Sequence, residues 1–321
     1  MSLRAAVLGA SGYTGGEVVR LLESHPAVSL DLVAAHQHAG RRLGDVHPHL
    51  HSSELELHAV DDALGWEGDV CFACLPATTL PPLVTRLEAE VVIDLADDFR
   101  DAPGWVYGIT EFTRGRVADA THIANPGCYP TAALLALVPL ARAGAITGEV
   151  VIDALSGLSG AGRSSADHLS LVHADGNAGA YGSTEHRHIP EIERGLAALG
   201  SLDATVSFTP HLVPMARGVL VTARARPARK LTDETCLALL KDAYHREPFV
   251  HVVPEWPSTK PLLGSNGVQV SARVDDRAGW VICSAALDNL VKGAAGQAIQ
   301  NANVALGIDE RAGLPTVGIW P

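Results

Sequence analysis

The chain has 321 residues, of which 47% are hydrophobic and 19% are charged, and this composition is typical of a globular protein with room for two domains. The formal net charge of −12 argues against a nucleic-acid partner, because phosphate backbones are bound by clustered Lys and Arg. We expect no membrane segment and no signal peptide, because no apolar run is long enough and the first strand begins almost at once. Five cysteines without a disulfide spacing favour a reducing, cytoplasmic setting.

A glycine-rich turn lies near the start of the chain. The short apolar run at 4–8 leads into Gly9-Ala10-Ser11-Gly12-Tyr13-Thr14-Gly15 and then into a helical pattern at 14–24. A turn of this kind between a strand and a helix is typical of dinucleotide binding, because the backbone can approach the pyrophosphate and the helix N-terminus stabilises its charge. The predicted cofactor-binding residues of this turn are Gly9, Ser11, Gly12, Tyr13, Thr14 and Gly15.

Strand-like and helix-like segments continue to alternate after this turn. We predict further strands at 28–35, 69–75, 91–95 and 121–124, and helices at 80–89 and 130–143. This alternation predicts a doubly wound, Rossmann-type parallel sheet.

Two features of this predicted sheet bear on the cofactor. Leu75 and Pro76 follow the 69–75 strand, at the carboxyl edge where such sheets bind cofactors. The second strand ends in His36-Gln37-His38, without a carboxylate for a free ribose hydroxyl, and Arg41 and Arg42 follow it. We therefore predict that NADP is preferred over NAD, with the two arginines near its extra phosphate.

From about residue 149 the hydrophobic pattern changes to a period of two, which indicates half-buried strands. These strands are predicted at 149–156, 204–209, 218–226, 267–274 and 279–286, with one helix at 232–245 after the cap-like Thr232. They indicate a mixed sheet with helices on one side. A final helix begins near Asp288, a good N-cap, and its small apolar face should return to the first domain.

The predicted fold class is therefore α/β, with a Rossmann-type parallel-sheet domain and a mixed α+β domain. We assign 1–147 with 288–321 to NADP binding and 148–287 to catalysis and dimerisation.

Cys128 is the candidate nucleophile. It follows Asn125-Pro126-Gly127 just before a predicted helix, where free backbone N–H groups and the positive helix end favour thiolate. Its position alone is also consistent with a structural role, because a lone cysteine is usually a small buried hydrophobic residue and Pro-Gly before a helix is a common turn. Cys71 and Cys74 should point to opposite faces of a strand, so neither a redox nor a metal role is expected of them. His47, His49 and His51 have no companion ligands at metal spacing, so no metal site is predicted.

Several motifs together resemble the N-acetyl-gamma-glutamyl-phosphate reductase family, within the wider group that includes aspartate-semialdehyde dehydrogenase. Besides the glycine turn, they are Asp45-Val46-His47-Pro48-His49-Leu50, Asn125-Pro126-Gly127-Cys128-Tyr129-Pro130-Thr131, the stretch from Ser156 to Arg163, His186-Arg187-His188-Ile189-Pro190-Glu191-Ile192, and the stretch from Asp288 to Gln297. They run in family order over nearly the whole chain. Two stretches depart from the family pattern, a short segment between Arg100 and Tyr107 and the His36-Gln37-His38 sequence.

The resemblance implies NADPH-dependent reduction of an acyl phosphate to an aldehyde, in arginine biosynthesis, through a cysteine thioester. It places the nucleophile at Cys128 and the acid/base at His188, with His186 as the other candidate. Ser159, Gly160 and Asn289 are implied cofactor contacts, although Asn289 could equally cap a helix.

The substrate is a small anion, and guanidinium groups match its oxyanions. Arg163, Arg217 and, more weakly, Arg100 are therefore predicted to bind it together with His186.

Three alternatives stay open at this point: a carrier-linked aminoadipyl-phosphate reductase of lysine biosynthesis, an aspartate-semialdehyde dehydrogenase, and an inactive redox-sensing protein that binds NADPH. We expect a homo-oligomer, a dimer or a tetramer.

Overall fold

The computed structural model describes residues 2–163 and 166–320. The chain forms two compact units, Met1–Gly127 with Ala294–Leu314 (unit 1) and Cys128–Gly293 with Pro315–Pro321 (unit 2). The first division falls one helix earlier than the predicted boundary at residue 147. The assignment of cofactor binding to 1–147 with 288–321, and of catalysis and dimerisation to 148–287, stays a prediction about function.

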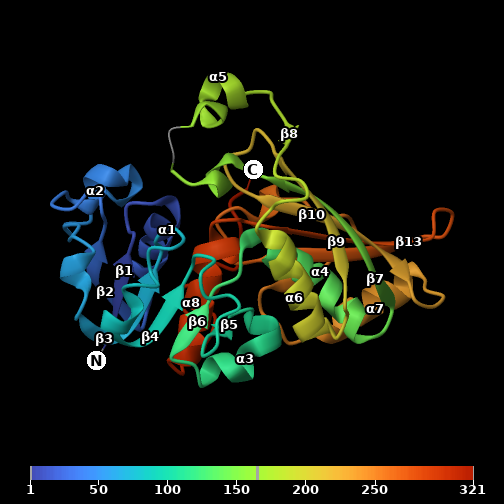
Figure 1. Cartoon of the computed structure of the whole chain (residues 1–321), viewed down its shortest axis with the longest axis horizontal. Coiled ribbons are helices and arrows are strands. Elements are labelled where there is room, and N and C mark those ends of the chain that lie inside the picture. Colours follow the sequence, from blue (N-terminus) through green and yellow to red (C-terminus); the bar gives the residue numbers. More distant parts are fainter. Residues whose placement is uncertain (1, 164–165, 321) are drawn as a thin grey trace. The chain divides into compact units, whose positions relative to one another are not determined.

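Unit 1 contains a parallel six-stranded sheet in the order β2-β1-β3-β4-β6-β5. Its strands are β1 (Leu3–Leu8), β2 (Val28–Ala34), β3 (Glu67–Ala73), β4 (Glu88–Asp94), β5 (Val106–Tyr107) and β6 (His122–Ala124). Because β2 and β3 pair with opposite edges of β1, the chain changes direction at the carboxyl ends of β1 and β3 (Figure 1). Open α/β sheets bind ligands at such a point. The predicted Rossmann-type fold is confirmed.

The helices of unit 1 are α1 (Tyr13–Leu22), α2 (Leu43–Val46), α3 (Thr110–Ala118) and α8 (Gly296–Ala305). Helix α8 contacts α1, α3 and β4, so the end of the chain helps to cover this sheet. Buried polar side chains join α8 to α3: Thr110 Oγ1 donates to Asn301 Oδ1 at 2.7 Å, and Gln297 Nε2 donates to Thr110 Oγ1 at 2.7 Å. These hydrogen bonds offset part of the desolvation cost of the buried groups.

The helix predicted at 80–89 is wrong. The segment forms turns and a short 3-10 helix at Val84–Arg86, and β4 begins at Glu88. Pro81 and Pro82 explain the difference, because proline restricts the residue before it to extended backbone and removes an N–H donor. The apolar residues of this segment are nevertheless partly in the core, since Leu80 is completely buried in a cluster with Leu8 of β1.

Unit 2 contains a mixed seven-stranded sheet in the order β11-β12-β13-β10-β7-β9-β8, as predicted. Two neighbouring pairs, β11 with β12 and β7 with β9, are parallel, and the other four are antiparallel. The strands are β7 (Ile146–Ser156), β8 (Gly179–Ala180), β9 (Thr205–Leu212), β10 (Val219–Pro227), β11 (Val250–Val252), β12 (Val268–Asp275) and β13 (Trp280–Leu287).

The helices of unit 2 are α4 (Cys128–Arg142), α5 (Leu171–Ala174), α6 (His188–Gly200) and α7 (Asp233–Tyr244). Helix α4 is buried from Tyr129 to Ala141 and contacts α6, α7 and the strands β10 and β13, so it forms the centre of the unit 2 core. Thr232 caps α7 as predicted, because its side chain accepts from the Thr235 N–H.

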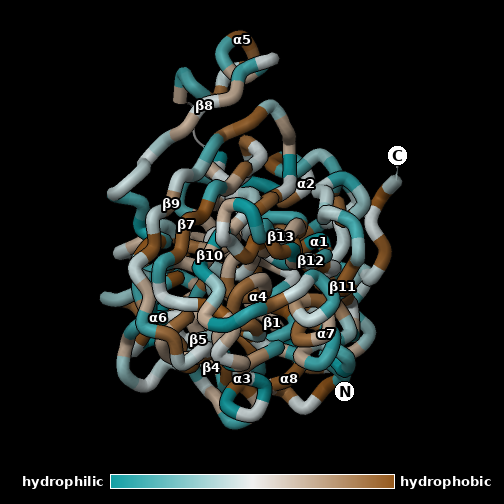
Figure 2. The backbone as a smooth tube through the Cα atoms, turned by 90° about the vertical axis from the view of Figure 1, so that its right-hand side faces the viewer, coloured by the Kyte–Doolittle hydropathy of each residue, from teal (hydrophilic) through white to brown (hydrophobic). Residues whose placement is uncertain are grey.

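Helix α5 belongs to an excursion, residues 166–178, that precedes β8 and stands away from the rest of unit 2 (Figure 1). Hydrophobic residues lie at its tip (Figure 2), where the side chains of Leu171 and Val172 are 81% and 96% exposed. In the described parts of the chain, no helix is both long and apolar enough to cross a membrane.

The turn between β1 and α1 generates a stability prediction. Gly9 has a φ of +82°, and a Cβ there would overlap the carbonyl oxygen of Cys74, whereas Gly40 has a φ of +80° and open space around it. A side chain in the left-handed region costs about 1–2 kcal/mol, and overpacking adds about 1–3 kcal/mol. Gly40→Ala should therefore lower the free energy of unfolding by the conformational cost alone, about 1–2 kcal/mol. Gly9→Ala should lower it by this cost and by the overpacking cost together.

Urea unfolding of the two variants measures this difference directly. Equal losses would contradict the close packing of the glycine turn against the end of β3.

Candidate active site

The glycine turn of unit 1 forms a cradle at the start of α1. A Cβ at Gly15 would overlap the Gly9 carbonyl oxygen, and one at Gly16 would overlap the ring of His47. His47 itself is buried, and its Nε2 lies 2.8 Å from the Ala10 carbonyl oxygen. This hydrogen bond ties the imidazole ring to the backbone of the glycine turn. The N-cap residue Gly12 has no capping side chain. Backbone N–H groups at this helix start can therefore bind a phosphate, and the turn fits a dinucleotide.

The other predicted cofactor residues of unit 1 flank this turn. Leu75 and Pro76 follow Cys74, whose N–H donates to the Leu8 carbonyl oxygen at 2.8 Å. Arg41 and Arg42 lie in the loop after β2. Arg42 is paired with Glu54 at 2.6 Å, and Arg41 makes only a longer contact of 3.4 Å to the Asp45 carbonyl oxygen. The Arg41 guanidinium therefore makes a weaker contact with the protein than the Arg42 guanidinium does.

The carboxyl end of β4 carries a buried carboxyl group, Asp94. Its Oδ1 accepts from the Ala96 N–H at 3.1 Å, and burial raises its pKa to about 6. Arg100, predicted to bind substrate, lies close by in unit 1 with a side chain only 6% exposed. It forms an ion pair with Asp97 at 2.6 Å and donates from Nε to the Asn125 carbonyl oxygen at 3.0 Å. Arg100 thus fastens the loop after β4 to the segment that leads to Cys128.

Cys128 is the first residue of α4, which begins two residues earlier than the predicted helix at 130–143, and it is partly exposed. A Cβ at Gly293 would lie 2.7 Å from Cys128 Cβ, so the backbone of residue 293 packs directly on the cysteine. The positive helix end favours thiolate here. The other four cysteines differ: burial raises the pKa of Cys71 to about 12 and that of Cys236 to about 11, and it also raises the pKa values of Cys74 and Cys283.

Aromatic and imidazole rings gather beside Cys128 in unit 2. The rings of His186 and His188 are 4.7 Å apart between centroids, and Tyr129 lies 5.7 Å and 5.8 Å from them. The Tyr129 and Tyr181 hydroxyls lie 3.0 Å apart. Burial raises the pKa of both tyrosines, and a negative charge on Cys128 raises them further. Both phenols therefore stay neutral hydrogen-bond donors close to the thiol.

A backbone contact distinguishes the two histidines. The N–H of His188, at the start of α6, donates to His186 Nδ1 at 3.1 Å. Neutral His186 must therefore carry its proton on Nε2, which makes that atom a donor. His188 is 4% exposed and packs edge-on against Tyr129. Of the two imidazoles, His188 is the one whose acceptor nitrogen is not fixed by this contact.

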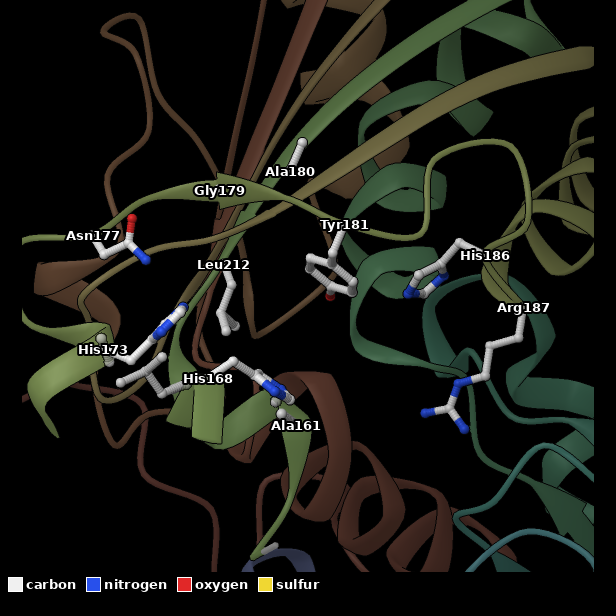
Figure 3. Close-up of a pocket in the computed structure, with 13 residues that line it drawn as sticks. Ala161, His168, His173, Asn177, Gly179, Ala180, Tyr181, His186, Arg187 and Leu212 are labelled. Carbon is white, nitrogen blue, oxygen red and sulfur yellow. The ribbon is translucent and has the colours of Figure 1, made fainter. Parts of the chain in front are cut away.

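A cavity of about 590 Å³ adjoins this cluster within unit 2 (Figure 3). Tyr181, His186 and Arg187 line one end, and His168 and His173 from the α5 excursion line the other. Its volume is in the range of small-molecule sites.

The remaining predicted residues also lie in unit 2. Asn289 Oδ1 accepts from the Gly218 N–H at 2.7 Å, and its Nδ2 donates to Ser159 Oγ at 3.0 Å, so it joins two loops. Arg217 lies 3.7 Å from the buried Asp288 carboxylate. Gly160 lines the cavity, and Arg163 is exposed and is not among the residues that line it. Asp288, not Asn289, caps the following turn, accepting from the N–H groups of Leu290 and Val291.

Sequence reasoning missed the two tyrosines. Tyr129 could have been noticed because it follows the cysteine directly, whereas nothing local to Tyr181 signals its position. Among the described residues, no group of three or more His, Cys, Asp or Glu is arranged to hold a metal ion.

Comparison with known proteins identifies the family. Residues 4–120 match the semialdehyde dehydrogenase NAD binding domain, and residues 128–289 match the semialdehyde dehydrogenase dimerisation domain. An N-acetyl-gamma-glutamyl-phosphate reductase of Acidothermus cellulolyticus is 44% identical over the full length of both chains. The chain belongs to the N-acetyl-gamma-glutamyl-phosphate reductase family. A further member, from Salinispora arenicola, is 43% identical, again over the full length of both. The predicted family and enzyme class are confirmed.

Solved structures show the same fold at low sequence identity. Aspartate semialdehyde dehydrogenase II from Vibrio cholerae has a TM-score of 0.77 at 17% identity, covering 96% of this chain and 99% of its own. Aspartate semialdehyde dehydrogenase with NADP from Candida albicans has a TM-score of 0.73 at 18% identity, with the same coverage.

Asp94 generates a prediction for stability against pH. Its raised pKa means that the folded state binds more protons than the unfolded state between about pH 4 and pH 6. Stability should therefore fall as pH rises through this window and stay lower above it. Asp94→Asn removes this loss, so at pH 8 the variant should be more stable than the wild type by up to about 3 kcal/mol, and nearly equal to it at pH 4.

Thermal unfolding from pH 4 to pH 8 tests this, with the exposed Asp242→Asn as the matched control. A constant difference between Asp94→Asn and wild type across the range would show that the carboxyl does not titrate as expected.

Proposed function

We propose that the protein is an NADPH-dependent reductase that converts N-acetyl-gamma-glutamyl phosphate into N-acetylglutamate 5-semialdehyde and phosphate, in arginine biosynthesis. The observation that carries this proposal is that His186 and His188 both pack against Tyr129, the residue after Cys128 at a helix start, in a full-length member of this reductase family. Such a site suits covalent acyl transfer.

Cys128 is the proposed nucleophile. Its thiolate attacks the acyl carbon, the new S–C bond forms, and the C–O bond to phosphate breaks, so that phosphate leaves with the electron pair. The product is a thioester, which retains the acyl group while the leaving group departs. Backbone N–H groups at the start of α4 stabilise the oxyanion that develops on the carbonyl oxygen.

His188 is the proposed acid/base. It takes the thiol proton before attack and donates a proton to the oxygen of the reduced, Cys128-bound acyl group. It then takes that hydroxyl proton back as the C–S bond breaks, so that the aldehyde carbonyl forms and the sulfur leaves as the thiolate. His186 has its Nδ1 occupied by the His188 N–H, so its Nε2–H suits hydrogen bonding to substrate better than proton removal.

NADPH, when bound, supplies the hydride that reduces the acyl carbon. The turn from Gly9 to Gly15 would hold its pyrophosphate, with Leu75 and Pro76 beside it and Arg41 or Arg42 near the ribose phosphate. Ser159, Gly160 and Asn289 stay proposed contacts of unit 2. The Asn289 amide already joins Gly218 to Ser159, so its loss would affect the loops as well as the cofactor.

The substrate anions are assigned to Arg163 and Arg217. The side chain of Arg217 is about one-third exposed, and its guanidinium lies 3.7 Å from the Asp288 carboxylate. Arg100 is a weaker candidate, because its side chain is buried and already bonded to Asp97 and Asn125.

The alternatives are less well supported. The full-length relatives are named as the arginine-pathway reductase, and neither a carrier-linked aminoadipyl substrate nor aspartate semialdehyde is favoured. An inactive NADPH sensor would not need a cysteine clustered with two histidines. We further propose a cytoplasmic homo-oligomer, a dimer or a tetramer, which the match of residues 128–289 to a dimerisation domain supports and light scattering can test.

The function is tested in the reverse direction, by incubating the protein with N-acetylglutamate 5-semialdehyde, NADP and phosphate. Formation of NADPH should require phosphate and should exceed that with a carrier-linked aminoadipate semialdehyde. Cys128→Ala should abolish turnover and leave NADP binding unchanged. Turnover above a few per cent in the variant would rule out the thioester route, and a better rate with the carrier-linked substrate would reassign the pathway.

The histidine roles are separated by two variants. His188→Ala should lower kcat by about 10²–10⁴, the range expected for a positioned acid/base group, while His186→Ala should act mainly on KM. The fall of kcat at low pH, where a base is protonated and inactive, should be lost only in the His188 variant. The opposite ranking would make His186 the base.

A further inference from the structure

The end of the unit 2 cavity farthest from the tyrosine and histidine cluster has no role in the chemistry described above. It is lined by His168 and His173, with Asn177 beside them, all from the excursion that carries α5. Figure 3 shows the two imidazoles near one another on one side, and Tyr181 and His186 on the other. One continuous space therefore joins these residues to Tyr181 and His186 of the cluster beside Cys128.

The polar groups at this end are available to a ligand. Within residues 2–163 and 166–320, no side chain or backbone group forms a hydrogen bond or ion pair with the side chains of His168, His173 or Asn177. The short helix α5 also has two distinct faces. His173 lines the cavity and the neighbouring Ala174 is 4% exposed, whereas Leu171 and Val172 face solvent.

The chemistry of the proposed substrate suits this arrangement. Its acyl carbon reacts at one end, and its α-carboxylate and acetamido group lie at the other, three carbons away. A carboxylate and an amide carbonyl need N–H donors, which imidazole and carboxamide side chains supply. The two ends of the substrate thus correspond to the two ends of the cavity.

We propose that His168 and His173, with Asn177, bind the α-carboxylate and acetamido end of the substrate and so determine specificity. This inference rests on the proposed function. The residues are specificity determinants and take no part in the bond-breaking steps.

The experiment compares two aldehydes in the reverse reaction, N-acetylglutamate 5-semialdehyde and butanal, which has the same reacting group without the carboxylate and amide. The variants are His168→Ala, His173→Ala and the double variant. Val172→Ala is the matched control, because Val172 lies on the same short helix and does not line the cavity. His173→Gln keeps an N–H donor and should retain part of the affinity.

The double variant should raise KM for the semialdehyde by about ten- to a hundredfold, the loss expected for hydrogen bonds to a charged group, with kcat within about threefold of wild type. Its efficiency with butanal should match wild type, and Val172→Ala should change neither. An unchanged KM, an equal loss with butanal, or the same rise in Val172→Ala would overturn the proposal.

A binding measurement separates this inference from the proposed function. N-acetylglutamate should bind Cys128→Ala, and adding His168→Ala and His173→Ala should weaken it by a similar factor in calorimetry. If the histidine substitutions weaken N-acetylglutamate binding but the wild type shows no phosphate-dependent turnover, the proposed function is rejected and the subsite is retained. If the wild type turns over but the histidine substitutions leave binding unchanged, only the subsite is rejected.

Discussion

The start of helix α4 is the constraint on which the site depends. Almost the whole helix is buried, so its axis and its first residue are fixed by packing against α6, α7 and the sheet of unit 2. Gly293 then packs on Cys128 so closely that any larger residue would displace the cysteine. A nucleophile held by a buried helix loses little freedom when it reacts, and the helix end supplies the field that favours its thiolate.

The segment after β13 contacts Cys128 and helps to fix its position. Asp288 is completely buried, and its carboxylate accepts from Leu290, Val291 and Gly264 N–H groups. The Gly293 N–H donates to the Asp288 carbonyl oxygen at 3.0 Å, within the π-turn at Val291–Ala295. Such turns are frequent at functional sites. Here Gly293, which packs against Cys128, lies within this π-turn.

The division of labour between the histidines also follows from the backbone. Because the first N–H of α6 takes up His186 Nδ1, one ring is held as a donor and the other remains suited to proton transfer. The tyrosine pair adds neutral donors, since burial keeps both phenols protonated. His168 and His173, at the other end of the cavity on the α5 excursion, take no part in this chemistry, so a change of these residues could alter substrate choice without altering it.

Local sequence determined most of the elements and singled out Cys128 as the candidate nucleophile. The strand, glycine turn and helix at 4–24, the period-two strands of unit 2, and the Asp288 cap each depend on residues close together in the chain, so their patterns are readable directly. The same reasoning failed at 80–89, where an apolar helical spacing reflected burial and two prolines decided the backbone.

Only the tertiary structure could decide which distant residues meet. The packing of Gly293 on Cys128, the hydroxyl contact of Tyr129 with Tyr181, and the placement of His168 and His173 at one end of a cavity join residues far apart in sequence. The same holds for the division before α4, which follows from what that helix packs against and not from its own pattern. Sequence periodicity records that a side chain is buried, but the neighbour that buries it is chosen by the folding of the whole chain.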